Sequence, residues 1–393
     1  MSRGKKLKAV FIVSDGIRGH VNQSRGVAHF LSLITGCEVR ELEANPAGFL
    51  AKIKAKRAID KEGGGQKELV RWLKRIGGLS FPEAVKETLH FLDAEGEEAL
   101  FLSAGSGVAP LCLSLGRLFK GGCVTIMTPA VLGTRPFDFA VVPEHDFPRP
   151  SKNVLVTLGA PNFITEEKIR QEAERLKELF PPRFEKRIGL LLGGDDGNYR
   201  ITPRWIEEVV KPVFGHADKN GADLYVTTSR RTSEESEKAL EGLAQKHPCV
   251  RYLCLASRDP YNPLYGIFGL ATHLLATEDS VSMVSEAATA GFRVGVLLAE
   301  RKKSAKRLAE GICKHLVDWK ILSAGCLFGV PKFVLAIERF CERGLACFIK
   351  DFADFESFIE NISSGKHGLQ FCEAKRAAEW IASAWEEGSR QSE

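Results

Sequence analysis

Short apolar, β-branched runs alternate with longer segments of helical periodicity along most of the chain. This alternation is typical of doubly wound α/β folds, in which helices connect parallel strands. The pattern runs through two rounds, separated by a polar helical segment that Pro181 and Pro182 end. The predicted strands are residues 8–14, 37–42, 99–105, 122–128, 139–143 and 153–159 in the first round, and 187–193, 222–229, 250–255, 273–278 and 294–299 in the second.

The helical segments divide the chain further. We expect a Rossmann-like domain over 1–160, a linker helix over 161–186, a second Rossmann-like domain over 187–345 and C-terminal helices over 346–393. Thr165, followed by two glutamates, predicts the start of the linker helix. The other predicted helices are residues 23–34, 108–119, 203–219, 233–246, 261–271, 280–291, 302–310, 351–362 and 371–385.

Composition places the chain among ordinary globular proteins of two domains, with 393 residues, 44% of them hydrophobic and 27% charged. No apolar run approaches the roughly 20 residues of a membrane span, and we interpret the first apolar run as a strand rather than a signal peptide. The ten cysteines show no CxxC pair and no close Cys/His cluster, which favours reduced thiols and no metal site. A cytoplasmic location follows from these features.

The net charge of +5 is unevenly placed, because residues 1–75 hold 16 lysines and arginines against 7 acidic residues. The basic stretches 51–61 and 67–75 are interleaved with apolar residues, which favours a pair of amphipathic helices. They form either a solvated face or a surface for an anionic membrane or an anionic acceptor, with peripheral contact at the inner membrane. No nucleic-acid-binding signature accompanies them.

Candidate chemistry lies in the loops after the strands, where doubly wound folds bind ligands. In the first round, Asp15 and His20 form the one acid–base pair of the loop at 14–28; the alternative is a cap or turn role. The small residues of 103–110 suit either a close approach of substrate or a tight turn. Neither loop matches a dinucleotide fingerprint or a Walker A motif. The further residues expected on this side are Gly19, Asn22, Gln23, Gly105 and Ser106.

In the second round, the glycines of 190–200 are a candidate diphosphate cradle, although Asp195 and Asp196 oppose an anion there. The next strand ends in an arginine pair suited to bidentate phosphate contacts, or to an exposed capping loop. After the fourth strand, a helix capped by Asp279 or Ser280 offers its amides to phosphate, and Glu286 suits the two hydroxyls of a ribose. The residues expected to bind a nucleotide are Gly193, Gly194, Ser229, Arg230, Arg231, Asp279, Ser280, Ser282 and Glu286.

Several blocks between about residues 12 and 297 resemble the mitochondrial-fission ELM ("elongated mitochondria") family, in its bacterial-type branch. They are SDGIRGHVNQSRGVA, GAPNFIT, LLLGGDDGNYR, TTSRRT and DPYNPLYGIFGLATHLLATEDSVSMVSEAATAG. The resemblance implies a GT-B-like fold: two Rossmann-like domains facing across a cleft, with C-terminal helices crossing back.

The stretch around Glu286 is also similar to the donor helix of the lipid-linked peptidoglycan N-acetylglucosaminyl transferase, where a matching glutamate holds the ribose. The loop ending in His20 is similar to the acceptor-facing glycine-rich loop of that enzyme, although DGIRGH carries fewer glycines. These resemblances imply a glycosyltransferase with no cofactor beyond its nucleotide-sugar substrate, of UDP type. We expect it to be metal-independent, because arginines and a helix terminus can carry the diphosphate charge; the one pair that could hold a metal is Asp195 with Asp196. Its acceptor would be a cell-envelope or lipid-linked molecule bound to the first domain at the cytoplasmic membrane face, with Asp15 or His20 as the base.

Two alternatives belong to other classes. The plant branch of the resembled family recruits a dynamin-related protein, which implies a non-catalytic scaffold. A nucleotide-sugar epimerase would share the fold, since one fold hosts many functions.

Overall fold

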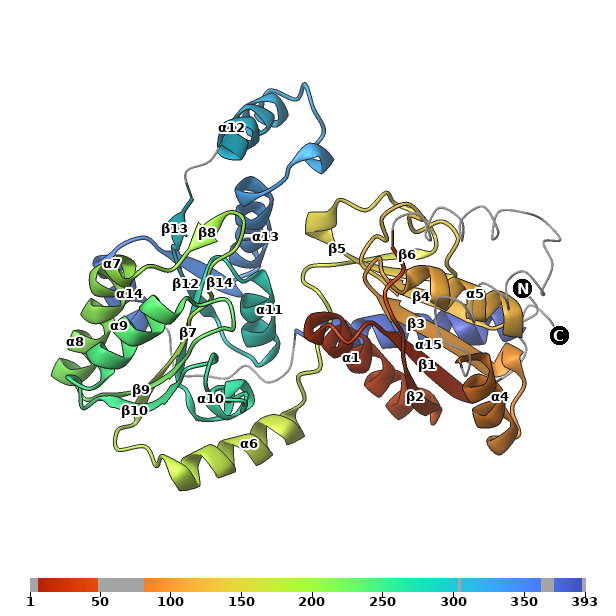
Figure 1. The fold of residues 1–393 in the computed structure, drawn as a ribbon, viewed down its shortest axis with the longest axis horizontal. Coiled ribbons are helices and arrows are strands. Elements are labelled where there is room, and N and C mark those ends of the chain that lie inside the picture. Colours follow the sequence, from red (N-terminus) through yellow and green to blue (C-terminus); the bar gives the residue numbers. More distant parts are fainter. Residues whose placement is uncertain (1–5, 49–80, 303–304, 362–370, 391–393) are drawn as a thin grey trace. The chain divides into compact units, whose positions relative to one another are not determined.

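The computed structural model describes residues 6–48, 81–302, 305–361 and 371–390, so the predicted amphipathic helices at 51–61 and 67–75 lie outside the described residues. The chain forms two compact units. Unit 1 contains residues 1–163 and 372–393, and unit 2 contains residues 164–371. Figure 1 shows one sheet in each unit, with helices on both faces.

Unit 1 is built on a six-stranded parallel sheet of order β2-β1-β3-β4-β5-β6. Every residue of β1 and of β3 is buried, as expected for central strands covered on both faces. All six strands of the first predicted round are confirmed, within one or two residues at each end. They are β1 (Ala9–Ser14), β2 (Glu38–Glu43), β3 (Ala99–Ala104), β4 (Gly122–Ile126), β5 (Phe139–Pro143) and β6 (Val154–Thr157).

Two hydrophobic clusters cover the faces of this sheet. On one face α1 (Arg18–Thr35) packs beside α15 (Glu373–Arg390), the helix that returns from the far end of the chain. On the other face lie α4 (Phe81–Phe91) and α5 (Ala109–Phe119). The returning helix supplies a stripe of alanines together with Ile381 and Trp385, so unit 1 is completed by residues distant in sequence.

Unit 2 contains a second six-stranded parallel sheet, of order β10-β9-β7-β11-β12-β14. Five of its strands confirm the second predicted round, and the edge strand β14 was missed because residues 346–393 were expected to form C-terminal helices. The six strands of this sheet are β7 (Lys186–Leu191), β9 (Ala222–Thr227), β10 (Val250–Cys254), β11 (His273–Thr277), β12 (Val294–Leu297) and β14 (Ala346–Ile349). A separate two-stranded antiparallel sheet is formed by β8 (Tyr199–Arg200) and β13 (Glu300–Arg301).

The helices of unit 2 follow the predicted order. One expected helix, 203–219, contains a π-helical stretch at Ile206–Val210. Pro212 follows this stretch; it lacks a backbone amide proton, and its ring crowds the carbonyl four residues earlier. The described helices are α6 (Glu166–Leu179), α7 (Pro203–Trp205), α8 (Lys211–Asn220), α9 (Glu234–Ala244), α10 (Leu264–Leu270), α11 (Val281–Thr289), α12 (Ala305–Asp318), α13 (Val330–Glu342) and α14 (Phe352–Asn361).

The limits of the units differ from the predicted domains in two places. The expected linker helix is α6, which begins after the N-cap Thr165 as predicted but packs against α10 within unit 2. Of the C-terminal helices, α14 stays with unit 2 beside β14, and α15 alone returns to unit 1. The reason is that β14 pairs with β12 and thereby ties residues 346–361 to the second sheet.

The ten cysteines are free thiols, five of them buried. No helix in the described ranges has the length and apolar character needed to cross a membrane.

Glu373 fastens α15 to the sheet of unit 1, because its buried carboxylate accepts the Leu158 amide at 2.7 Å and the Arg376 guanidinium at 2.6 Å. We expect Glu373→Ala to lower the free energy of unfolding by about 1–3 kcal/mol, since a buried amide loses its acceptor. Urea denaturation measures the change. The control is Glu379→Ala on the same helix, whose carboxylate is 55% exposed and 3.9 Å from Lys375, and which should cost well under 1 kcal/mol. Equal losses in both variants would contradict this role of Glu373.

Candidate functional site

Asp15 and His20 meet at the carboxyl end of β1. His20 Nδ1 lies 2.8 Å from Asp15 Oδ2, and the other carboxylate oxygen accepts the Ile17 amide at 3.1 Å. The Asp15 side chain is 2% exposed, whereas that of His20 is 26% exposed. The predicted acid–base pair is therefore a hydrogen-bonded dyad in which the buried carboxylate orients the ring and the imidazole reaches the surface of the unit.

Helix α1 begins at Arg18, five residues before the predicted start, so His20 and Gly19 lie in its first turn rather than in a loop. Gly16 has a φ of 72°, a conformation that favours glycine and turns the chain between the strand and the helix. This early start fixes the backbone of His20, because a helical residue has less freedom than a loop residue.

The loop after β3 approaches the dyad closely. Gly105 has a φ of 83°, and an added Cβ would collide with the His20 ring. Ser106 Oγ accepts the Ala130 amide at 2.7 Å, which gives it a bracing role in the loop. The structure thus brings Gly105 against His20, and the glycine makes the tight turn, which is one of the two expected roles, and leaves room for the ring.

Gln23 lies one helical turn after His20, and Asn22 beside it has a hydrogen-bonding or electrostatic partner. The Oε1 atom of Gln23 is buried with no hydrogen-bond partner among the described residues. Ser103 lies near the end of β3, opposite Val13 of β1. Its hydroxyl oxygen is likewise buried with no hydrogen-bond partner among the described residues. Buried polar atoms are normally satisfied, so these two are exceptions among the described residues.

In unit 2 the predicted nucleotide loops converge on one carboxylate. Asp279 has a fully buried side chain that accepts the Gly194 amide at 2.9 Å, the Thr277 hydroxyl at 2.6 Å and the Arg231 guanidinium at 2.8 Å. Burial raises the pKa of Asp279, and these three partners oppose the rise. Asp279 therefore holds the loops after β7 and β9 against the end of β11. The sequence had suggested that it caps the helix or contacts the nucleotide.

The glycine loop is held from both sides. Gly193 donates its amide to Thr277 Oγ1 at 2.8 Å and accepts the Thr232 hydroxyl at 2.5 Å. An added Cβ would collide with the Asp279 carboxylate at Gly193 and with the backbone of Arg231 at Gly194. Both glycines are required for close packing of the loops, and their amides are used within the protein, which corrects the expected diphosphate cradle.

The two arginines of the predicted pair have different surroundings. Arg231 is bound to Asp279 and lies 3.8 Å from Asp196, whereas Arg230 is exposed and makes no ion pair within the described ranges. Ser229 shapes this turn by accepting the Arg231 amide at 3.2 Å. Only Arg230 keeps its charge uncompensated for a ligand.

Asp195 and Asp196 are occupied by neighbours. Asp196 Oδ1 accepts the amides of Asn198 and Tyr199, and Asp195 lies 3.5 Å from Lys302 Nζ. These contacts explain how two carboxylates are accommodated in a glycine loop.

Helix α11 carries the remaining predicted residues. The side chain of Ser280 accepts the Met283 amide at 3.4 Å, which identifies Ser280 as the N-cap of α11. The first backbone bond runs from Val284 to Ser280, which leaves the amides of Val281 and Ser282 without a partner inside the helix. Ser282 is exposed and Glu286, one turn later on the same face, is half-buried.

Glu286 affects the pKa of a tyrosine on a neighbouring helix. Burial, and after it Glu286, raise the pKa of Tyr265 on α10 to about 12. Lys168 Nζ lies 4.3 Å from the centre of the same tyrosine ring. Ser282 and Glu286 thus form a polar ridge on α11, beside an aromatic side chain.

Sequence reasoning missed the residues that hold these loops together. Thr277 and Thr232 fasten the glycine loop, and the buried Glu278, whose pKa is raised by burial, is paired with Arg301 at 3.4 Å. The only signal was the polar run at the end of a buried strand, in which Thr277, Glu278 and Asp279 are consecutive.

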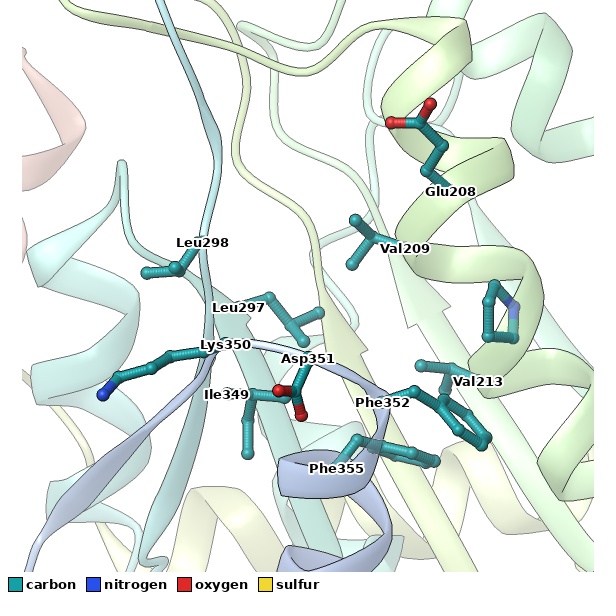
Figure 2. Close-up of a pocket in the computed structure, with 11 residues that line it drawn as sticks. Glu208, Val209, Val213, Leu297, Leu298, Ile349, Lys350, Asp351, Phe352 and Phe355 are labelled. Atoms are coloured by element: carbon teal, nitrogen blue, oxygen red, sulfur yellow. The ribbon is translucent and has the colours of Figure 1, made fainter.

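A cavity of about 290 Å³ opens elsewhere in unit 2, between the helix at 203–220 and the ends of β12 and β14. Figure 2 shows its mainly apolar lining, with Val209, Val213 and Leu297 around Phe355 and the carboxylates of Glu208 and Asp351. None of the predicted site residues lines it.

One group in the described ranges has the ligand types of a metal site. Asp218, His247 and Cys249 gather at the amino ends of β9 and β10, opposite the loops described above. Their polar atoms are already engaged, since His247 Nδ1 lies 2.6 Å from Asp218 and the Cys249 amide donates to the same carboxylate at 2.9 Å. Burial raises the pKa of the Cys249 thiol well above its ordinary value.

Comparisons with known proteins agree with this architecture. The sequence profile described as mitochondrial fission ELM1 matches residues 18–323. No curated protein sequence matches the chain.

Among solved structures, a UDP-N-acetylglucosamine 2-epimerase candidate from Listeria monocytogenes matches at a TM-score of 0.50 and 12% identity, over 98% of each chain. MurG of Acinetobacter baumannii matches at a TM-score of 0.44 and 14% identity, over 97% of this chain and 99% of its own. UGT71G1 of Medicago truncatula, solved with UDP-glucose, matches at 0.44 and 10%, over 98% and 99%. The fold, two Rossmann-like units of GT-B type, is thereby confirmed.

The contrast between the two arginines can be tested. We expect Arg231→Ala to lower the free energy of unfolding at pH 7 by about 1–3 kcal/mol, because the buried Asp279 carboxylate loses its counter-ion while the arginine itself is 40% exposed. The matched control, Arg230→Ala, should change it by less than about 0.5 kcal/mol.

The loss in Arg231→Ala should shrink as the pH falls through the Asp279 pKa, since a protonated carboxyl needs no counter-ion. Denaturant titrations across this pH range measure the effect. A loss that is constant with pH, or equal in the two variants, would show that the Asp279–Arg231 pair does not hold the loops.

Proposed function

The chain belongs to the mitochondrial fission ELM1 family, and we propose that it is a nucleotide-sugar-dependent glycosyltransferase. In this proposal unit 1 binds an acceptor hydroxyl and unit 2 binds a UDP-type donor. The reaction requires a base at the acceptor, and a group that stabilises the departing diphosphate.

The observation that carries the proposal is the Asp15–His20 dyad. The buried carboxylate accepts a hydrogen bond from Nδ1–H, and in this tautomer Nε2 carries the lone pair of a base. Of the two residues that the sequence left open, His20 is the base, because it is the exposed member, and Asp15 is its positioning residue. Gln23 Oε1 and Ser103 Oγ, both unsatisfied and near this end of the sheet, support an acceptor with several hydroxyl groups.

On the donor side, the proposal assigns diphosphate binding to Arg230 and to the amides of Val281 and Ser282. Helix N-termini and uncompensated arginines are the usual anion partners in proteins. Glu286 then takes the ribose hydroxyls from its position one turn further along α11. Charge stabilisation of this kind is independent of a metal.

The chemical step is a displacement at the anomeric carbon. His20 Nε2 takes the proton of the acceptor hydroxyl, the acceptor oxygen bonds to the anomeric carbon, and the bond from that carbon to the diphosphate oxygen breaks. The nucleoside diphosphate leaves with the bonding electrons. A cell-envelope or lipid-linked acceptor at the cytoplasmic face of the membrane is consistent with the basic composition of residues 1–75.

Donor binding is tested by thermal shift with UDP, GDP, ADP, CMP and their common sugar conjugates. We expect a UDP-type ligand at about 100 times its Kd to add about 2.7 kcal/mol of stability, and Glu286→Ala to abolish most of the shift. Arg231→Ala is unsuitable as a probe because it weakens the fold, so Arg230→Ala is the second variant. A well-folded protein with no shift for any nucleotide would favour a non-catalytic scaffold.

The base is tested by kinetics in the presence of EDTA. We expect His20→Ala to lower kcat by about 10²–10⁴-fold while the nucleotide-induced melting shift stays unchanged. Asp15→Asn should also lower kcat, because an amide no longer fixes the same tautomer. His29→Ala is the matched control, since this histidine lies on the same helix and contacts Phe163 instead.

Product analysis separates the enzyme classes. A donor sugar that is inverted at a ring carbon without any acceptor would identify an epimerase, and full activity in His20→Ala would exclude the dyad as the base.

A further inference from the structure

Exposed large apolar side chains are concentrated in one segment of unit 2. Of the fourteen such side chains among the described residues, six lie within residues 305–328, which form α12 and the chain that follows it. Large apolar residues on a soluble surface are normally scattered, and their concentration marks an interaction site. The six are Leu308, Ile312, Trp319, Ile321, Leu322 and Phe328.

The apolar residues of α12 form one stripe. Leu308 and Ile312 are four residues apart, and the Trp319 amide continues the helical pattern by donating to His315 O at 2.9 Å. The exposed fractions of Leu308, Ile312 and Trp319 are 72%, 54% and 71%. These side chains therefore share one side of the helix and point away from the unit.

The opposite side of α12 packs against the protein. Glu310 is 3% exposed and lies against Gly329, and Cys313 Sγ donates to Cys326 O at 3.2 Å. The inward side of α12 also holds the half-buried Leu316 and Val317, so the exposed stripe is a second apolar face in addition to the one that packs. Figure 1 shows α12 standing off from the sheet of unit 2, with α13 between them.

Basic residues border the stripe. Residues 305–328 contain four lysines and arginines against Glu310 and Asp318. Glu310 is buried and Asp318 is paired with Lys314 at 2.8 Å, so Arg307 and Lys320 remain exposed without a paired acid in the described ranges. The exposed face is therefore apolar at its centre and positive at its edge.

We propose that residues 305–328 form a membrane-docking surface that inserts the stripe of Leu308, Ile312 and Trp319 into the headgroup region of an anionic bilayer. An apolar helix face with basic edges and a tryptophan is the composition of interfacial helices. A second copy of the chain is a poorer partner, because the stripe has basic residues at its edge and a symmetric contact would bring two such positive edges together. The proposal does not rest on the transferase activity, since docking requires neither donor nor chemistry.

Vesicle co-sedimentation of the full chain, without nucleotide, tests the surface. We expect binding to vesicles of phosphatidylglycerol with phosphatidylcholine, and little binding to pure phosphatidylcholine. The triple variant Leu308→Ser, Ile312→Ser, Trp319→Ser should bind at least about tenfold more weakly. Lys320→Gln should bind about fivefold more weakly, as expected for one basic residue near an anionic surface.

The matched control is the triple variant Leu33→Ser, Phe91→Ser, Leu179→Ser, whose side chains are 68%, 78% and 65% exposed at other places. It should bind like the wild type. A second measurement does not depend on the folding of the triple variant: brominated lipids should quench part of the tryptophan fluorescence of the wild type, and Trp319→Phe should lose that quenching.

Three results would overturn the proposal. One is vesicle binding that persists in the stripe variant, which would place the membrane contact elsewhere in the chain. Another is equal weakening by the control variant. The last is a wild-type dimer that the stripe variant converts to a monomer while neither binds vesicles, which would make the stripe an interface between copies.

Discussion

The architecture of unit 2 depends on one buried carboxylate. Asp279 follows β11 directly and joins the loops after β7 and β9 to it, since it binds Gly194, Arg231 and Thr277 at once. A charge in that position would be costly without partners, so the loops must arrive in the arrangement that supplies them. The same bonds set the start of α11, because Ser280 follows Asp279 directly and caps the helix. The first amides of that helix are thus positioned by the Asp279–Arg231 ion pair.

Unit 1 uses a different device for the same purpose. There a glycine, Gly105, lets the backbone of one loop lie against the His20 ring, while Asp15 holds the ring from its other side. Both units therefore place their polar groups at the carboxyl ends of parallel strands and restrain them by contacts between loops. Such restraint is what a reactive site requires, because groups held in place need not be ordered when a ligand binds.

The family relationship and the site bear on different questions. Membership of the ELM1 family and the GT-B architecture establish the fold, whereas catalysis depends on a few side chains that a scaffold could lose without consequence. In this chain the Asp15–His20 dyad lies in unit 1, and the first amides of α11 and Glu286 lie in unit 2. The apolar stripe on α12 is independent of them, and it would serve a transferase or a scaffold equally well by holding either at a membrane surface.

The sequence by itself determined the rhythm of strands and helices, since burial on both faces requires apolar runs that can be read directly. Eleven of the strands and the glycine turns were predictable for this reason, as was the dyad between Asp15 and His20, which are near neighbours in the chain. The sequence, by contrast, does not show which of Arg230 and Arg231 is used by the fold and which is left for a ligand. The same holds for the amide of Gly193 and the first amides of α11. Only the tertiary structure decided that Arg231 and Gly193 serve the fold while Arg230 and the helix amides remain available. The reason is that Asp279 lies 48 residues beyond Arg231, and no local pattern shows which polar group a buried carboxylate will take.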